Sequence, residues 1–381
     1  MFWNIKASRS KPSRVLFLHH EASNTGSTRL LLDFLRYLHS QNPEFSSALC
    51  FYRAGALLDE FISLGFPVFV FDPDKEQSRK KTKFERMVSL LWFSIVLIRV
   101  RPALLYANTV MSSTSVLVAG CAGIRTLVHV HEGPRYLDRI GAGLRFSALL
   151  TDRFIAVSEY CANGIREILE RSSSVLRNWS PLEETEKIGN ARIAGTGIVL
   201  GIVGTVDRNK HHLLALLALA SLRESAGRTV RIRIVGPIVD MAYAQDLERA
   251  ATLLGVSDVV ELTGAAANPE AIYPLLDMVL ITSMEETFSL VALEAARYRK
   301  PIVAADVGGI RECITRDATA FFFRAGDWQS LRVALQDALS GQATFGTQDL
   351  RFPVVHAGAP EMNQQGGPQR LLELIRSELE V

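Results

Sequence analysis

Two glutamates beside a short apolar run offer the clearest chemistry in the chain. Glu286 follows the apolar run 278–282 and a polar break, and Glu294 lies about two turns into a segment with helical spacing. A second apolar run, 302–305, completes a strand, helix and strand. A right-handed parallel crossover places both connecting loops at the carboxyl edge of the sheet, where ligands bind. We therefore expect both carboxylates to reach one crevice, where they can accept hydrogen bonds from hydroxyl groups.

Basic and small residues are predicted at the same edge. Gly308 and Gly309 follow the second strand, and an earlier apolar strand ending at Gly204 is followed by Arg208 and Lys210. Preorganised cations there would stabilise a leaving group that gains negative charge in the transition state. The chain has no GxGxxG motif at this strand and no acidic residue after the next one, which disfavours a dinucleotide oxidoreductase.

These residues together resemble a known family. The segments Glu286-Thr287-Phe288-Ser289 to Glu294 and Val307-Gly308-Gly309-Ile310-Arg311-Glu312 are similar to the motifs of the retaining glycosyltransferases of family four, also called glycosyl transferases group 1. The resemblance implies the GT-B fold, an α/β architecture of two Rossmann-like, doubly wound parallel-sheet domains facing a cleft. The chain departs from the family at Thr205, where an arginine is usual, and at Thr287 and Ser289, where glycines are usual.

The same resemblance implies a role for each residue that matches the family pattern. Glu294 would bind the ribose hydroxyls and Glu286 the donor sugar, while Arg208 and Lys210 would bind the diphosphate. Backbone groups of the turn and helix start at Phe288, Ser289 and Leu290 would contact sugar or phosphate. The ligand is a UDP-, GDP- or ADP-sugar, and no further cofactor or metal is expected.

The first half of the chain supplies two more site candidates. Gly26 precedes a predicted amphipathic helix, 28–40, and a helix start with free amides suits an anion. His131 ends the predicted strand 126–131, and in the family a histidine here touches the donor sugar. Asp72-Pro73-Asp74 is formally a DxD metal motif, but we interpret it as a strand-ending turn, and we expect no metal site at His19 and His20.

The segment 79–101 carries about twelve apolar residues between basic flanks, too short to span a bilayer. Two interpretations remain open: a helix resting in the headgroup layer of an anionic membrane, or a buried core helix with a solvated basic lead-in. Residues 1–178 hold 23 Lys and Arg against 15 Asp and Glu, whereas the remainder holds 19 against 25. An anionic membrane surface is therefore a candidate partner of the first half, and no nucleic acid is expected.

The 381 residues and 48% hydrophobic content predict two or more globular domains. Four scattered cysteines without CxxC spacing argue against a disulfide framework or a zinc site, and the chain lacks a signal-peptide or membrane-spanning pattern. We expect a cytoplasmic protein, peripheral at the inner face of the membrane if the basic segment binds lipid. The predicted boundaries are an acceptor-side domain at 1–178, a linker at 179–197, a nucleotide-sugar domain at 198–365 and a terminal helix at 366–381 that crosses back to the first domain.

The resulting hypothesis is transfer of a sugar from a nucleotide-sugar donor to a glycan, lipid-linked or small-molecule acceptor, with retention, as in polysaccharide biosynthesis. Two alternatives stay open: a nucleotide-sugar epimerase of the same fold, and a non-catalytic sugar-nucleotide-binding partner. The sequence identifies neither the sugar, the base, the acceptor nor the oligomeric state.

Overall fold

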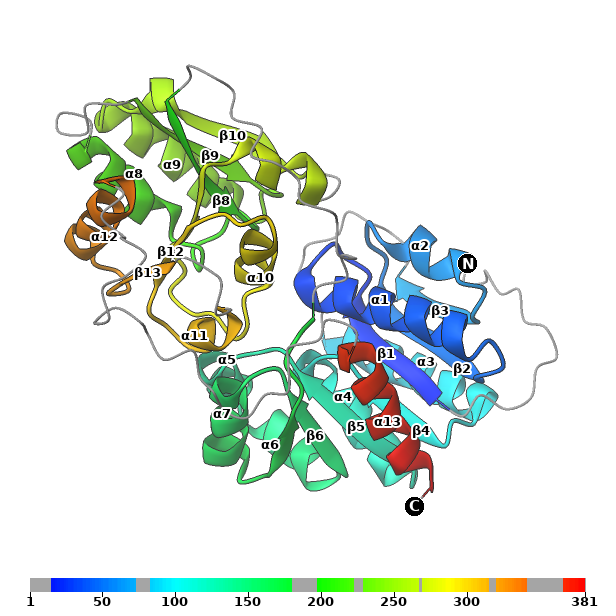
Figure 1. Ribbon diagram of the computed structural model, residues 1–381. Coiled ribbons are helices and arrows are strands. Elements are labelled where there is room, and N and C mark those ends of the chain that lie inside the picture. The colour runs from blue at the N-terminus through cyan, green and yellow to red at the C-terminus, as the bar shows by residue number, and fades with distance from the viewer. Residues whose placement is uncertain are drawn as a thin grey trace. The chain divides into compact units, whose positions relative to one another are not determined.

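The structure is a computed structural model that describes residues 15–72, 83–179, 197–222, 229–266, 269–314, 320–340 and 366–380. It divides into two compact units, one formed by residues 1–181 and 360–381 and the other by residues 182–359 (Figure 1). Each unit contains one parallel sheet with helical crossovers, which confirms the predicted pair of doubly wound α/β domains.

The first unit is built on a seven-stranded sheet of order β3-β2-β1-β4-β5-β6-β7. Its strands are β1 (Val15–Glu21), β2 (Ser47–Arg53), β3 (Val68–Asp72), β4 (Leu104–Ala107), β5 (Arg125–Val130), β6 (Arg153–Ala156) and β7 (Ser173–Val175). Its helices are α1 (Gly26–Gln41), α2 (Leu58–Ser63), α3 (Lys83–Val100), η1 (Val110–Ser112), α4 (Ser113–Cys121), α5 (Pro134–Ile140), α6 (Ala142–Leu149), α7 (Glu159–Leu169) and α13 (Gly366–Glu380).

The second unit repeats the plan with six strands in the order β10-β9-β8-β11-β12-β13. The strands are β8 (Ile198–Val203), β9 (Val230–Val235), β10 (Val260–Gly264), β11 (Met278–Ile281), β12 (Ile302–Ala305) and β13 (Ala320–Phe323). The helices are α8 (His212–Leu222), α9 (Met241–Leu253), η2 (Ser257–Val259), η3 (Pro269–Ala271), η4 (Tyr273–Leu275), α10 (Leu290–Arg297), α11 (Ile310–Cys313) and α12 (Trp328–Ser340).

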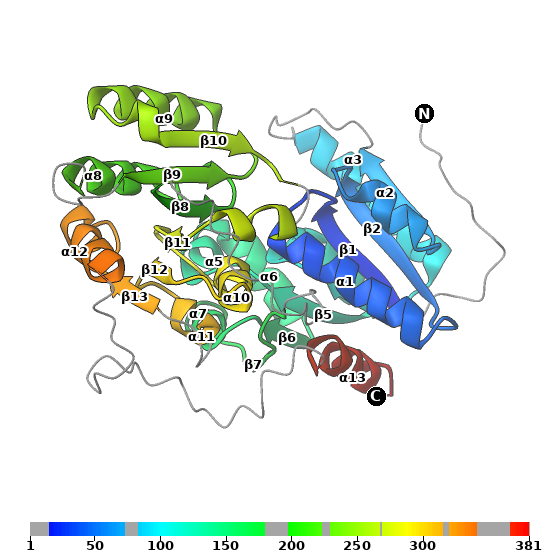
Figure 2. The same cartoon turned by 45° about the horizontal axis from the view of Figure 1, so that its top comes forward.

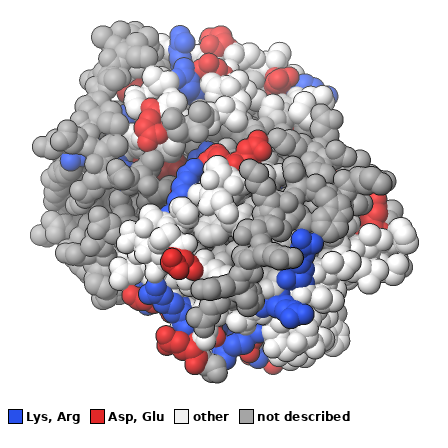
Figure 3. Space-filling model, turned by 90° about the vertical axis from the view of Figure 1, so that its right-hand side faces the viewer, with Lys and Arg blue, Asp and Glu red and all other residues white. Residues whose placement is uncertain are grey.

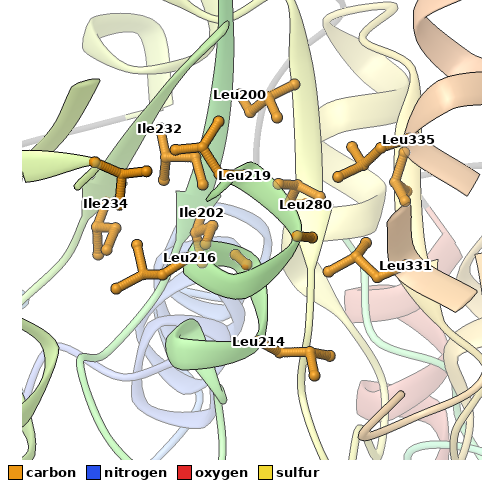
Figure 4. Packing of buried hydrophobic residues seen from close by; sticks show 14 of the residues in the cluster. Leu200, Ile202, Leu214, Leu216, Leu219, Ile232, Ile234, Leu280, Leu331 and Leu335 are labelled. Carbon is orange, nitrogen blue, oxygen red and sulfur yellow. The ribbon is translucent and has the colours of Figure 1, made fainter. Parts of the chain in front are cut away.

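Continuous apolar runs explain the central strands of both sheets. A parallel strand covered by helices on both faces has no solvated side, so the first four residues of β1 and all of β11 are apolar. In the second unit, leucine and isoleucine side chains from β8, β9 and β11 pack against α8 and α12 (Figure 4). This core fixes the carboxyl ends of β8, β11 and β12, from which the functional loops extend.

The structure moves several predicted boundaries by one or two residues. α1 begins at Gly26 instead of Thr28, so Gly26 is the first helical residue and not a loop residue before the helix. β5 ends at Val130, so His131 follows the strand. Asp72 ends β3, while Pro73 and Asp74 lie outside the described residues, as do most of the predicted linker and residues 341–365.

The terminal helix α13 packs against α1 in the first unit (Figure 1, Figure 2). Leu371, Leu372 and Ile375 are buried there. On the same helix, Glu378 accepts from Arg125 at 2.6 Å and pairs with Arg153 at 3.0 Å. One buried carboxylate thus links the chain's last helix to the first residues of β5 and β6.

We expect Glu378→Ala to destabilise the first unit by about 1–3 kcal/mol, because two guanidinium groups lose their shared carboxylate. The lower part of this range reflects the partial exposure of Arg125 and Arg153, whose side chains are 32% and 37% accessible. Urea denaturation followed by circular dichroism measures the loss, with Glu373→Ala on the same helix as the control. Equal midpoints for the two variants would show that the ion pairs contribute nothing to stability.

Candidate functional site

The centre of the second unit's site is the pair formed by Lys210 and Glu286. Lys210 Nζ donates to Glu286 Oε1 at 2.6 Å, and Ser283 Oγ donates to the same oxygen at 2.7 Å. The Glu286 side chain is 8% exposed and that of Lys210 is 21% exposed, so water screens this pair only in part. The pair joins the loop after β8 to the loop after β11, as expected from parallel strands that end at one sheet edge.

Backbone hydrogen bonds hold these loops in place. Gly309 N–H donates to the Glu286 carbonyl at 2.8 Å, which attaches the Gly308-Gly309 loop to the glutamate turn. Thr282 Oγ1 donates to the Lys210 carbonyl at 2.6 Å. Gly308 has a φ of 56°, a left-handed conformation that favours glycine. The charged pair is therefore supported by three connected loops.

Asp207 organises the turn that carries Lys210. Its Oδ1 accepts from the N–H groups of Asn209 and Lys210 at 2.8 and 3.1 Å, an arrangement that stabilises a tight turn. Its Oδ2 accepts from Thr205 Oγ1 at 2.6 Å. Thr205, which stands where the family usually has arginine, is thus part of the support for this loop.

Arg208 lies on the same loop but has different partners. Its guanidinium approaches Asp240 at 3.3 Å and Asp246 at 3.6 Å, and it lies over the Tyr243 ring. The side chain is 66% exposed. The structure therefore brings Lys210 to Glu286 and directs Arg208 to acidic side chains at α9.

Glu294 lies on α10 and is oriented by a residue from a distant part of the sequence. Tyr273 Oη donates to Glu294 Oε2 at 2.6 Å, and the Tyr273 ring stacks on Tyr298 with centroids 5.1 Å apart. Tyr273 is fully buried, so its hydroxyl fixes the carboxylate from the protein side. The remaining carboxylate lone pairs suit a pair of neighbouring hydroxyls.

The turn before α10 places backbone amides at the start of a helix. Ser289 is the N-cap, and its Oγ accepts from Ala292 N–H at 3.3 Å. Ser289 N–H donates to Cys313 Sγ at 3.0 Å, and Phe288 is buried beside it. Leu290 is the first helical residue. Because a helix N-terminus carries partial positive charge, this turn favours an anionic group nearby.

In the first unit, polar groups gather after β1, β4 and β5. Asn108 Nδ2 donates to the Ser27 carbonyl at 2.9 Å, and Asn108 Oδ1 lies 3.2 Å from His131 Nε2. His19 Nε2 lies 3.4 Å from Ser27 Oγ. Gly26 begins α1 immediately before Ser27. Gly26 and His131, which stand far apart in sequence, are thus connected through Ser27 and Asn108.

The hydrogen bonds also define the protonation of His131. Because the Asn108 amide already donates through Nδ2, its Oδ1 is the acceptor, and His131 Nε2 must carry a proton. Burial and the neighbouring His129 hold the pKa of His131 well below 6.5. At neutral pH, His131 therefore acts as a neutral hydrogen-bonding group. Glu132 supports this turn by accepting from His131 N–H at 3.0 Å and from Thr109 Oγ1.

We expect stability to fall as the pH drops below about 6.5, because burial depresses the pKa of the histidines at this edge. Burial lowers the pKa of His20 to about 4 and that of His129 to about 3. Below the unfolded value of about 6.5, the unfolded chain binds protons that the folded chain excludes, so each such group costs up to about 1.4 kcal/mol per pH unit. Well above pH 6.5 these histidines are neutral in the folded and the unfolded chain, so this cost to the free energy of unfolding disappears.

Urea unfolding of wild type and His20→Gln between pH 7.5 and 5 tests this expectation. The variant should show a shallower decline of the unfolding midpoint with acidification, since one depressed group is absent. Parallel declines in both proteins would contradict the assignment.

Among the residues that the structure describes, no group of three or more His, Cys, Asp or Glu side chains is arranged to hold a metal ion. Likewise, no helix among those residues is both long and apolar enough to cross a membrane.

Several supporting residues were not among the sequence candidates, and Asn108, Tyr273 and Asp207 are three of them. Asn108 follows a buried strand directly, and a polar residue in that position is a signal that could have indicated it. Tyr273 and Asp207 act through tertiary contacts with Glu294 and the Lys210 turn. Nothing in their local sequence marks them.

Comparison with known families confirms the resemblance drawn from the motifs. Residues 183–349 match the family model described as "Glycosyl transferases group 1". This range contains Lys210, Glu286 and Glu294 with all the loops that position them. The family match thus lies within the second unit.

Curated relatives match part of the chain. A D-inositol 3-phosphate glycosyltransferase of Actinosynnema mirum is 28% identical over 200 residues, which cover 48% of each chain. A 2-deoxystreptamine glucosyltransferase of Streptomyces kanamyceticus is 29% identical over 149 residues, 39% of this chain and 38% of the relative. The matches therefore span about half or less of the length of these relatives.

Solved structures extend the comparison to the whole fold. Anabaena HepE, crystallised with UDP and glucose, superposes with a TM-score of 0.71 at 19% identity and covers 97% of both chains. WaaG, a glycosyltransferase involved in lipopolysaccharide biosynthesis, gives a TM-score of 0.67 at 14% identity, covering 95% of this chain and 99% of its own. These likenesses confirm the GT-B fold class predicted from the sequence.

Proposed function

We propose that the protein transfers a sugar from a nucleotide-sugar donor to an acceptor hydroxyl. The observation that carries this proposal is the Lys210–Glu286–Ser283 cluster at the carboxyl edge of the second sheet, inside the family match. A cation, a partly buried carboxylate and a helix N-terminus stand there together. These groups suit a ligand that combines a diphosphate with hydroxyl-bearing sugars.

Lys210 is assigned to the diphosphate. As the bond between the sugar's anomeric carbon and the diphosphate oxygen breaks, the bonding electrons pass to the diphosphate, and its negative charge increases. A cation fixed by Asp207 and Glu286 is already in place to stabilise that charge. Arg208 can bind the same diphosphate by exchanging Asp240 and Asp246 for phosphate oxygens.

Glu286 is assigned to the donor sugar and Glu294 to the ribose. Glu286 shares one oxygen with Lys210 and Ser283, which leaves Oε2 for a sugar hydroxyl. Tyr273 orients Glu294 for two neighbouring ribose hydroxyls. The amides at the start of α10, near Phe288, Ser289 and Leu290, are assigned to phosphate or sugar oxygens.

We assign His131 and the start of α1 at Gly26 to the parts of the ligand that the first unit would bind. A neutral His131, whose Nε2–H donates to Asn108, offers Nδ1 as an acceptor to a sugar hydroxyl without adding charge. We infer retention of configuration from the family resemblance, and UDP is the nucleotide to test first because HepE binds UDP and UDP-glucose. A cytoplasmic location is consistent with the four free cysteines.

The test incubates the full chain with UDP-, GDP- and ADP-sugars, with and without acceptor sugars, and follows the reaction by proton NMR. We expect release of one nucleoside diphosphate and a product whose anomeric coupling matches that of the donor. A changed ring stereocentre in an intact donor would identify an epimerase instead. Tight donor binding without turnover on any acceptor would indicate a non-catalytic sugar-nucleotide-binding protein.

A further inference from the structure

Helix α3 presents a continuous row of large apolar side chains to solvent. The row recurs at helical spacing along one side and extends over nearly the whole helix. Its members are Phe84 (69% exposed), Met87 (52%), Leu91 (59%), Ile95 (63%) and Ile98 (69%). We call these five residues the α3 stripe. From Phe84 to Ile98 it extends for about 21 Å at 1.5 Å per residue.

The other side of α3 packs against the core of the first unit. Phe93, Val96 and Leu97 are buried, and Trp92 packs against the Phe71 ring at a centroid distance of 5.3 Å. The helix is therefore fixed by its inner side, and the α3 stripe is not needed for the core. One side of the helix is therefore core, while the opposite side is exposed and apolar, and membrane contact stays a prediction.

Basic residues lie near both ends of the α3 stripe. Arg86 lies in the second turn, while Arg99 and Arg101 lie at the other end, and all three are exposed. Glu85 is the sole acidic residue from Lys83 to Arg101. Long basic side chains can keep their charges among lipid headgroups while neighbouring apolar side chains enter the acyl boundary.

Helix α6, in the same helical layer, carries two further exposed apolar side chains. α4 packs against both α3 and α6 in the helical layer of the first unit. On α6, Phe146 is 61% and Leu149 is 69% exposed, and the exposed Arg145 precedes them. On the face drawn in Figure 3, the described residues show Lys and Arg as well as Asp and Glu side chains among uncharged ones. In the proposed attachment, the five exposed apolar side chains of the α3 stripe supply much of the binding, and the basic residues add selectivity for anionic lipid.

We propose that the α3 stripe, extended by Phe146 and Leu149, docks the first unit onto an anionic lipid bilayer. The helix lies in the plane of the headgroups, its apolar side enters the acyl boundary, and Arg86, Arg99, Arg101 and Arg145 contact lipid phosphates. The chemistry favours a bilayer over a protein partner because the stripe is a single long row with basic flanks, as in interfacial helices. This inference is independent of the catalytic assignment.

The test is co-sedimentation of the full chain with phosphatidylglycerol vesicles and with phosphatidylcholine vesicles, at low and high salt. Wild type should sediment with phosphatidylglycerol alone, and salt should weaken the binding because it screens the arginines. The triple variant Leu91→Ser/Ile95→Ser/Ile98→Ser should lose at least about tenfold in partitioning, since each buried apolar side chain favours insertion. Leu253→Ser, at an 88% exposed position of α9, is the matched control and should bind like wild type.

Two further variants complete the test. Phe146→Ser/Leu149→Ser should weaken partitioning to a smaller degree, and Arg86→Gln/Arg101→Gln should reduce the salt dependence. All changed side chains are exposed, and circular dichroism verifies that the variants fold. Wild-type binding that the triple variant retains would overturn the proposal. A wild type that ignores both vesicles but forms a dimer lost in the triple variant would overturn it in favour of an interface between copies of the chain.

Discussion

Lys210→Met is expected to lower kcat by about 10²- to 10³-fold, the cost of removing one preorganised group that stabilises transition-state charge. Methionine keeps most of the side-chain length, so the apolar contacts of the stem survive. Binding of the nucleoside alone should change little, because Lys210 is assigned to the diphosphate. Steady-state turnover of the donor, together with calorimetric titration of nucleoside and nucleoside diphosphate, separates the two effects.

A loss of folding must be distinguished from a loss of chemistry, since Lys210→Met also leaves the mostly buried Glu286 without its cation. The double variant Lys210→Met/Glu286→Gln removes that uncompensated charge and should recover thermal stability without recovering turnover. Arg208→Met is the matched control on the same loop, and we expect it to lower kcat less than tenfold, because Arg208 is exposed and pairs with α9. A kcat for Lys210→Met close to the wild-type value would exclude Lys210 from the reaction.

Glu294→Ala should weaken nucleoside diphosphate binding by about 1.5–3 kcal/mol, or roughly 10- to 150-fold in Kd, because a charged acceptor is removed from two hydroxyls. The loss of affinity should depend on the 2′-hydroxyl of the ribose. Wild type is expected to prefer UDP over 2′-deoxy-UDP, and the variant should bind the two nucleotides almost equally. Calorimetric titration of both nucleotides into both proteins gives this comparison directly.

Tyr273→Phe provides the matched control for Glu294. It removes the 2.6 Å hydrogen bond that orients the carboxylate but keeps the charge, so its effect on Kd should be smaller. The buried Tyr273–Tyr298 stack remains, and stability should be largely preserved. A Glu294→Ala protein that still discriminates between UDP and 2′-deoxy-UDP would place the ribose elsewhere.

The fold could be predicted because its signals are local. Apolar runs such as 15–19 and 302–305 gave the strands, and the alternation with helical segments gave the two doubly wound sheets. The neighbourhood of Lys210 and Glu286 followed from the same reasoning, since parallel strands end at one edge. The start of α1 differs from the predicted residue because a helix without a side-chain cap has no sharp sequence signal for its first residue.

What escaped prediction depends on tertiary contacts. The side chain of Arg208 points away from Lys210 because it pairs with Asp240 and Asp246. Both aspartates follow the next strand and are distant from Arg208 in sequence. The support of Glu294 by Tyr273 bridges 21 positions. For α3, composition indicated both an apolar core helix and a surface helix, and only the exposure of individual residues assigned each side.

The most direct measurement for the central assignment is a calorimetric titration of UDP, GDP and ADP into the full chain and into Glu294→Ala/Lys210→Met. We predict that one nucleoside diphosphate binds wild type at a single site, and that the double variant loses this binding while its circular dichroism spectrum is unchanged. Wild-type protein that binds none of the three, or a double variant that binds as tightly as wild type, would contradict it.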